Sequence, residues 1–128
     1  MVPMATEKTE EKQGPDALEI GRRAVDIAAD RGAHDVVLLD VRGLCSYADA
    51  FVLLSGETKR QVKAIEEEIG KELRAEGHPV SHTEGEADAG WVLMDFGDVI
   101  VHIFGREERT FYGLEDMWRR AVPLIRIQ

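Results

Sequence analysis

Histidines and a cysteine are the side chains of this chain that could bind a transition metal or act as a nucleophile. His78 and His82 have i, i+4 spacing, which suits a shared metal only on a helix, and Pro79 between them argues against a helix. Cys45 has only Arg42 as a basic neighbour within several residues, which is too little to activate a thiol. The chain also lacks the C-x-x-C, H-E-x-x-H, G-x-G-x-x-G and P-loop motifs. We therefore expect no metal, no cofactor and a structural or incidental cysteine.

Phosphoryl or nucleotidyl transfer is the enzymatic alternative that we considered. Ser55 and Gly56 form a turn before a predicted helix, and such a turn is a natural anion site. The chemistry also needs carboxylates close enough to bridge two metal ions. Asp95 and Asp98 are the nearest candidates, but Asp98 lies in a predicted turn and no basic cluster neighbours them. We expect no catalytic residue, and a nucleotidyltransferase-like enzyme acting on a nucleotide substrate stays as the alternative.

The charge of the chain is distributed unevenly. Its 16 basic and 25 acidic residues give a net charge of −9 and a sequence pI near 4.9. A field of this sign repels phosphate backbones, so we expect no sequence-specific nucleic-acid partner. Five acids fall in a stretch without Lys or Arg: Glu84, Glu86, Asp88, Asp95 and Asp98. This stretch is either a solvated loop or a surface that faces a basic partner.

Length and composition indicate one domain that is not inserted in a membrane. The 128 residues are 44% hydrophobic, which is enough for one core. No apolar run approaches the ~20 residues of a spanning helix, and residues 1–14 have no apolar signal-peptide core. One cysteine fits a reducing compartment, so we expect a cytoplasmic protein. The predicted organisation is a flexible tail at 1–14, a folded domain at 15–122 and a short C-terminal tail at 123–128.

Hydrophobic periodicity predicts helices and strands that alternate along the chain. The expected order is a helix opened by Pro15 and Asp16 and stopped by Gly32, strands at 36–41 and 50–55, a helix from 58 to 76, a short strand at 80–83, strands at 91–96 and 99–104, and a helix at 106–120. Because strands and helices are interleaved and one hairpin is present, we expect an α/β fold. It would be a single domain with a mixed sheet flanked by helices.

Two sequence signals mark the ends of the second helix. Thr58 and Gln61 have the spacing of a capping box, in which each side chain satisfies a free backbone N–H of the first turn. Gly77 stands where a C-terminal cap is expected.

The predicted hairpin has a register that assigns its side chains to two faces. A two-residue Gly97-Asp98 turn sets Phe96 opposite Val99 and Trp91 opposite Phe104. One face is wholly apolar and is expected in the core: Val92, Met94, Phe96, Val99, Val101 and Ile103. The other face mixes apolar groups with an acid and a histidine: Trp91, Leu93, Asp95, Ile100, His102 and Phe104.

Two hypotheses remain open for the mixed face. In the first, a helix covers it and the polar pair lies at the edge. In the second, it is partly open and binds a partner through an aromatic anchor, with the acidic stretch steering a basic partner toward it. On the second hypothesis the partner-binding residues are Trp91, Leu93, Asp95, Asp98, His102 and Phe104.

Two stretches together resemble the ribosomal silencing factors, also called the Iojap-related proteins. The first runs from Asp35 through Leu44 (DVVLLDVRGL) and, with gaps, to Ile65. The second is the W-V-L-x-D-x-G-D-V-x-V-H run that begins at Trp91, followed by the F-Y-x-L-E-x-x-W pattern that ends at Trp118. The resemblance covers roughly residues 17–120. The chain departs from the family pattern at 45–48 (CSYA), where a serine- and threonine-containing turn is usual.

The resemblance implies a fold similar to nucleotidyltransferases without their catalytic carboxylates. It implies binding to the large ribosomal subunit through its fourteenth protein, a basic partner, so that joining with the small subunit is blocked when nutrients are short. It also implies a homodimer in the free state. On the last predicted helix, Glu107 and Glu108 are expected to complement the helix dipole. Four apolar residues at helical spacing are expected in the core: Phe111, Tyr112, Leu114 and Trp118.

Overall fold

The computed structural model describes residues 17–128, so the expected tail at 1–14 and the helix-opening Pro15 and Asp16 lie outside the described residues. The elements are α2 (Ala17–Asp30), β1 (His34–Asp40), β2 (Ala50–Gly56), α3 (Lys59–Ala75), β3 (His82–Glu86), the 3-10 turn η1 (Ala87–Ala89), β4 (Trp91–Asp95), β5 (Val99–Gly105), α4 (Arg106–Tyr112), α5 (Leu114–Met117) and β6 (Val122–Ile127).

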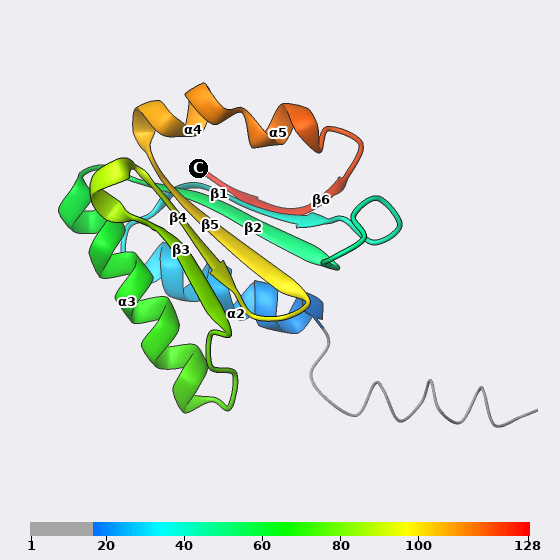
Figure 1. Cartoon of the computed structure of the whole chain (residues 1–128), viewed down its shortest axis with the longest axis horizontal. Helices are drawn as coiled ribbons and strands as arrows, with labels where there is room; N and C mark the ends of the chain where they lie inside the picture. The colour runs from blue at the N-terminus through cyan, green and yellow to red at the C-terminus, as the bar shows by residue number, and fades with distance from the viewer. Residues whose placement is uncertain (1–16) are drawn as a thin grey trace, which may run out of the picture.

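Six strands form one mixed sheet in the order β3-β4-β5-β2-β1-β6. The central pair, β2 and β5, is parallel, and the other neighbours are antiparallel. Figure 1 shows α2 and α3 on one side of the sheet and α4 and α5 on the other. The mixed α/β sheet flanked by helices is therefore confirmed.

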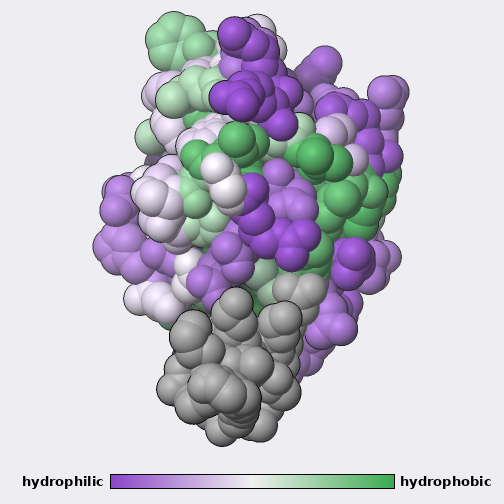
Figure 2. Space-filling view, turned by 90° about the vertical axis from the view of Figure 1, so that its right-hand side faces the viewer, coloured by the Kyte–Doolittle hydropathy of each residue, from purple (hydrophilic) through white to green (hydrophobic). Residues whose placement is uncertain are grey.

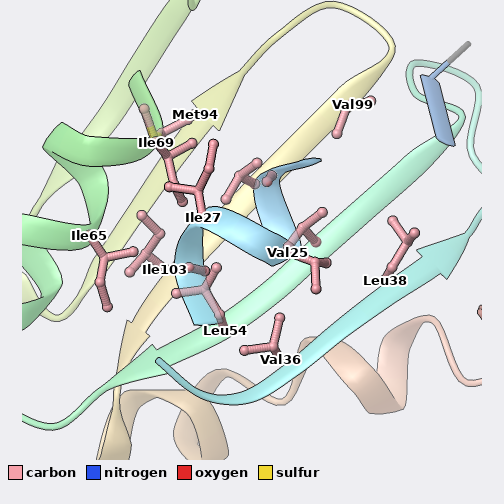
Figure 3. Packing of buried hydrophobic residues seen from close by; sticks show 14 of the residues in the cluster. Val25, Ile27, Val36, Leu38, Leu54, Ile65, Ile69, Met94, Val99 and Ile103 are labelled. Carbon is pink, nitrogen blue, oxygen red and sulfur yellow. The ribbon is translucent and has the colours of Figure 1, made fainter. Parts of the chain in front are cut away.

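The main core lies between the sheet and the α2–α3 layer. Side chains from both helices and from the strands interdigitate there, as Figure 3 shows for Ile27, Ile65, Leu54 and Ile103. The hairpin face predicted to be core belongs to this cluster, with Phe96 only partly buried. Gly32 has a φ of +80°, which suits the stop expected after α2.

A second, smaller core lies between the other side of the sheet and the α4–α5 layer. Phe51, Leu53 and Phe104 are buried in it beneath Leu114. The edge of this cluster is only partly buried, at Cys45, Trp91, Leu93 and Trp118. The helical cover on this side thus ends before the sheet does.

The predicted caps of α3 are present with one change of partner. The Thr58 hydroxyl accepts a hydrogen bond from the Gln61 backbone N–H, 3.1 Å away. The Gln61 side chain accepts from the N–H of Glu57, one residue before the expected partner. Its amide also donates to the carbonyls of Arg31 and Gly32, which ties α3 to the end of α2.

The predicted helix at 106–120 is present only as two shorter helices that end at Met117, and the predicted tail at 123–128 was wrong. Gly113 adopts a left-handed φ of +56° and divides the helix into α4 and α5. Residues 122–127 form β6, which pairs with β1 at the edge of the sheet. Pro123 is tolerated there because the edge strand needs no N–H on its outer side.

The short strand expected at 80–83 lies slightly later, as β3. Val80 is partly buried against the main core, but pairing begins at Ser81, whose N–H donates to the Asp95 carbonyl. Glu84 and Glu86 consequently stand on an exposed edge strand rather than in a loop.

Candidate functional site

The hairpin register predicted from the sequence is confirmed. Trp91 pairs with Phe104, Leu93 with His102 and Asp95 with Ile100. The mixed face therefore exists, and it combines features of both hypotheses. The α4–α5 side covers its β5 half, and its β4 edge is partly open.

Two of the six predicted partner-binding residues are buried. His102 is 5% exposed and Phe104 is 0% exposed, because α4 and α5 lie over this part of the sheet. These two side chains have no direct access to a partner and instead support their neighbours. Trp91, Leu93 and Asp95 are half-buried, and Asp98 is exposed.

The two aspartates of this set help to build the hairpin turn. The Asp95 carboxylate accepts a hydrogen bond from the Gly97 N–H, 2.8 Å away. The Asp98 carbonyl accepts from the N–H groups of Asp49 and Ala50, which joins the turn to the start of β2. The carboxylate of Asp98 remains available at the surface, at the end of the sheet away from Trp91.

A cavity of about 300 Å³ opens beside Trp91 and Leu93. Its other walls are Glu84, Gly85, Ala89 and Tyr112. The rings of Trp91 and Tyr112 lie 4.4 Å apart between centroids, so α4 and β4 form one continuous aromatic wall. We call Trp91, Leu93, Tyr112 and this cavity the Trp91 surface.

The contribution of α4 to this surface was not predicted from the sequence. Phe111 was expected in the core, but it is 80% exposed, and Tyr112 is 40% exposed. The expectation treated 106–120 as one helix, whose apolar stripe would face the sheet throughout. Because Gly113 ends α4 after seven residues, only Leu114 is buried and Trp118 is half-buried. The left-handed preference of glycine was the available signal.

His102 makes a specific contact beneath the Trp91 surface. The indole Nε1–H of Trp91 donates to His102 Nδ1 at 3.2 Å. Phe51 packs edge-on against the imidazole, and Phe104 stacks nearly parallel to it. Burial lowers the pKa of His102 to about 4, so the imidazole is neutral at physiological pH. With Nδ1 accepting, the proton of the neutral ring belongs on Nε2.

A polar cavity of about 460 Å³ lies where the parallel strands β2 and β5 end, the usual ligand position of α/β sheets. Its cations already have partners. Arg109 donates to the Ser55 hydroxyl and, through Nε and Nη2, to the carboxylate of Glu115. This guanidinium lowers the pKa of Glu115. Arg106 is likewise paired with Glu57.

Further apolar side chains are exposed at the opposite end of the α4–α5 side, where β1 leads into the 41–49 loop and β6 begins. Figure 2 views this end and shows apolar and hydrophilic side chains next to one another. The exposed apolar residues of this region are Leu44, Tyr47, Met117 and Val122.

Residues 17–128 hold neither a metal-binding cluster nor a membrane-spanning helix. This part of the chain holds no group of three or more His, Cys, Asp or Glu side chains arranged for a metal ion. None of its helices is long and apolar enough to cross a membrane.

Comparison with known proteins places these features in a family. A family model described as "Ribosomal silencing factor during starvation" matches residues 14–128. The ribosomal silencing factor RsfS of Bacillus subtilis is 41% identical over 104 residues, which are 81% of this chain and 86% of that protein. A mouse protein named "Mitochondrial assembly of ribosomal large subunit protein 1" is 29% identical over 97 residues, 73% of this chain and 42% of its own length.

A solved structure supports the same assignment. The crystal structure of a Chromobacterium violaceum protein superimposes with a TM-score of 0.77 at 31% sequence identity, covering 80% of this chain and 86% of that one. The family match spans the whole described fold, including the hairpin and the α4–α5 segment from which the Trp91 surface is built. The chain therefore belongs to the ribosomal silencing factor family.

Proposed function

We propose that this protein is a translational repressor that binds the large ribosomal subunit through its fourteenth protein and blocks joining with the small subunit under nutrient limitation. Family membership supports a ribosome-associated repressor, and the family description itself includes starvation. The name of the mouse relative refers to the large subunit. On this proposal the protein acts in the cytoplasm and catalyses no reaction.

The observation that carries the proposal is the Trp91 surface. It offers a half-buried tryptophan and leucine beside an open cavity, with Glu84 at the rim and Glu86 opposite Trp91 in the neighbouring strand. Aromatic anchors surrounded by polar groups are typical of binding hot spots. The acidic rim complements a basic partner and favours its approach. The other four predicted partner-binding residues have structural roles. The hairpin turn is built by Asp95 and Asp98, and the Trp91 surface is supported by the buried His102 and Phe104.

Sedimentation with separated ribosomal subunits tests the proposal. The wild-type protein should migrate with the large subunit and reduce formation of joined ribosomes. Trp91→Ala should weaken this binding about thirtyfold or more, because truncating a central anchor costs about 2 kcal/mol or more. Leu124→Ala, a truncation to alanine on the opposite edge strand β6, is the control and should bind as wild type.

Two outcomes would contradict the proposal. One is migration with the small subunit alone. The other is wild-type binding by Trp91→Ala, whose folding is checked by circular dichroism. If that variant is unfolded, Tyr112→Ala takes its place, since its ring is partly exposed on the same surface.

A nucleotidyltransferase-like enzyme is the competing function, and the polar cavity at Ser55 is its natural location. The internal pairing of Arg106 and Arg109 leaves these cations committed to Glu57 and Glu115 rather than to a phosphate. A calorimetric titration with ATP and Mg²⁺ separates the two functions. We expect no binding. Saturable binding that Arg109→Lys weakens would favour the enzyme.

A homodimer in the free protein is also part of the proposal. The Trp91 surface is apolar enough to be covered by a second copy when no ribosome is present. Analytical ultracentrifugation of wild type and Trp91→Ala at several concentrations tests this. A dimer that persists unchanged in Trp91→Ala would place the dimer contact elsewhere.

A further inference from the structure

We propose that His102 is a positioning residue, which holds the Trp91 indole in the orientation that binds the partner. The inference rests on the proposed function of the Trp91 surface and assigns a role to a side chain that the partner does not touch. Its basis is the hydrogen bond from Trp91 Nε1 to His102 Nδ1, at 3.2 Å.

The indole of Trp91 is half-buried on β4, beside the open cavity. It packs against Phe104 and Tyr112, with ring centroids 5.2 and 4.4 Å away. These ring contacts restrict the plane of the indole but tolerate sliding and flipping. A hydrogen bond from the single N–H group of the indole prevents both sliding and flipping, because it fixes the direction of Nε1. The bond therefore selects which edge of the indole faces the cavity.

His102 is itself held rigidly, as a positioning group must be. It is 5% exposed and stands on β5 between Leu93 of β4 and Leu53 of β2. Phe51 packs against its ring with an interplanar angle of 79°, and the Phe104 ring is inclined to it by only 10°. A fixed second residue of this kind gives a binding residue its precise geometry.

The residue type also fits the role. The indole N–H needs an acceptor, and a neutral imidazole offers one at Nδ1. A carboxylate at this position would be a buried charge, and an aliphatic side chain would leave the N–H group without a partner. Ordering the indole before binding also removes an entropy cost that the complex would otherwise carry.

A double-mutant cycle tests the proposal, with purified large ribosomal subunits as the probe and sedimentation as the assay. The single variants are His102→Leu, which lacks an acceptor, and Trp91→Phe, which keeps a ring but lacks the N–H. His102→Leu should weaken binding about three- to tenfold, the equivalent of one neutral hydrogen bond. In the Trp91→Phe background the same change should have no further effect, because the hydrogen bond is already gone.

His102→Asn is the conservative variant, because its amide oxygen can take the place of Nδ1 as the acceptor. We expect it to restore most of the binding lost in His102→Leu. In the free protein, a ¹⁵N–¹H spectrum should show slow hydrogen exchange at the Trp91 Nε1–H in wild type and His102→Asn and faster exchange in His102→Leu. Trp118→Phe identifies the Trp91 signal, since these are the two tryptophans of the chain.

The outcomes separate this inference from the proposed function. If wild type binds and Trp91→Ala does not, but His102→Leu binds as wild type, the positioning role is wrong and the proposed surface stands. An equal loss from His102→Leu in the wild-type and Trp91→Phe backgrounds also overturns it, since His102 would then act independently of the indole. If wild type itself does not bind the large subunit, the proposed function fails. In that case the exchange measurement alone decides whether His102 orders Trp91.

Discussion

At the scale of single residues, the buried imidazole links binding geometry to stability. His102 has a pKa of about 4 in the folded protein because burial disfavours its charged form. An exposed histidine in the unfolded chain titrates near 6.5. Protonation would also place a second donor opposite the indole N–H of Trp91 and break their hydrogen bond.

We predict a fall in stability of up to about 3 kcal/mol from His102 alone as the pH drops from about 6.5 to about 4. Within this window the unfolded chain binds more protons than the folded one, so the contribution is complete above pH 6.5 and lost below pH 4. Urea unfolding of wild type and His102→Asn at pH 7.5, 5.5 and 4.5 measures it. The difference between the two proteins isolates His102 from carboxylates that titrate nearby, and a difference independent of pH would refute the prediction.

At the scale of elements, local signals and tertiary contacts contribute differently to each segment. The α3 start is fixed locally, by the Thr58 hydroxyl on the Gln61 N–H. β6 is held by contacts with distant segments: pairing with β1, the packing of Ile125 against the main core and an ion pair between Arg126 and Glu115. Mutation at the start of α3 should therefore cost the stability that its N-terminal cap contributes. Mutation in β6 should cost the stability that packing contributes.

Thr58→Ala should destabilise the protein by about 1 kcal/mol, because the first turn of α3 loses its side-chain cap. Thr58→Ser keeps a hydroxyl at the same position and is the matched control, expected within a few tenths of a kcal/mol of wild type. Thermal and urea unfolding measure both. A Thr58→Ala protein as stable as Thr58→Ser would show that the Gln61 contacts alone suffice.

Ile125→Ala should destabilise the protein by about 1 kcal/mol or more, while Ile127→Ala should have a clearly smaller effect. Ile125 packs against the main core, whereas Ile127, on the same strand, is 39% exposed and belongs to neither core cluster. Equal effects of the two substitutions on urea unfolding would mean that β6 is not docked on β1 in solution.

At the scale of the whole molecule, the net charge of −9 affects how partners approach rather than how the chain folds. The acids of β3 lie beside the Trp91 surface, with Glu86 directly opposite Trp91 in the sheet. Exposed charges near an interface mainly alter the association rate and its dependence on salt.

Glu86→Gln should therefore slow association with the large subunit at low salt and have little effect at physiological salt. Asp26→Asn, which removes an exposed acid from α2 on the other side of the sheet, is the control with the same change in net charge. Stopped-flow association at two salt concentrations makes the comparison. Equal slowing by both variants would show that only total charge matters.

The sequence by itself determined the central elements, the mixed sheet and the hairpin register. Period-2 and period-3.6 patterns arise from local geometry, and a two-residue turn leaves one register, in which one face of the hairpin is wholly apolar. This is why Trp91, Leu93 and His102 could be assigned to one face before the fold was known. The family-typical motifs in the same hairpin led to the resemblance that the comparisons confirmed.

Only the tertiary structure decided which part of that face is open. Burial of His102 and Phe104 depends on where α4 and α5 lie, and that depends on Gly113 breaking one periodic stripe into two short helices. The formation of β6 also depends on the tertiary structure, because its pairing partner β1 lies more than 80 residues earlier in the sequence. Contacts between distant segments leave no local pattern, so the cavity beside Trp91 and the hydrogen bond to His102 follow from the folded chain alone.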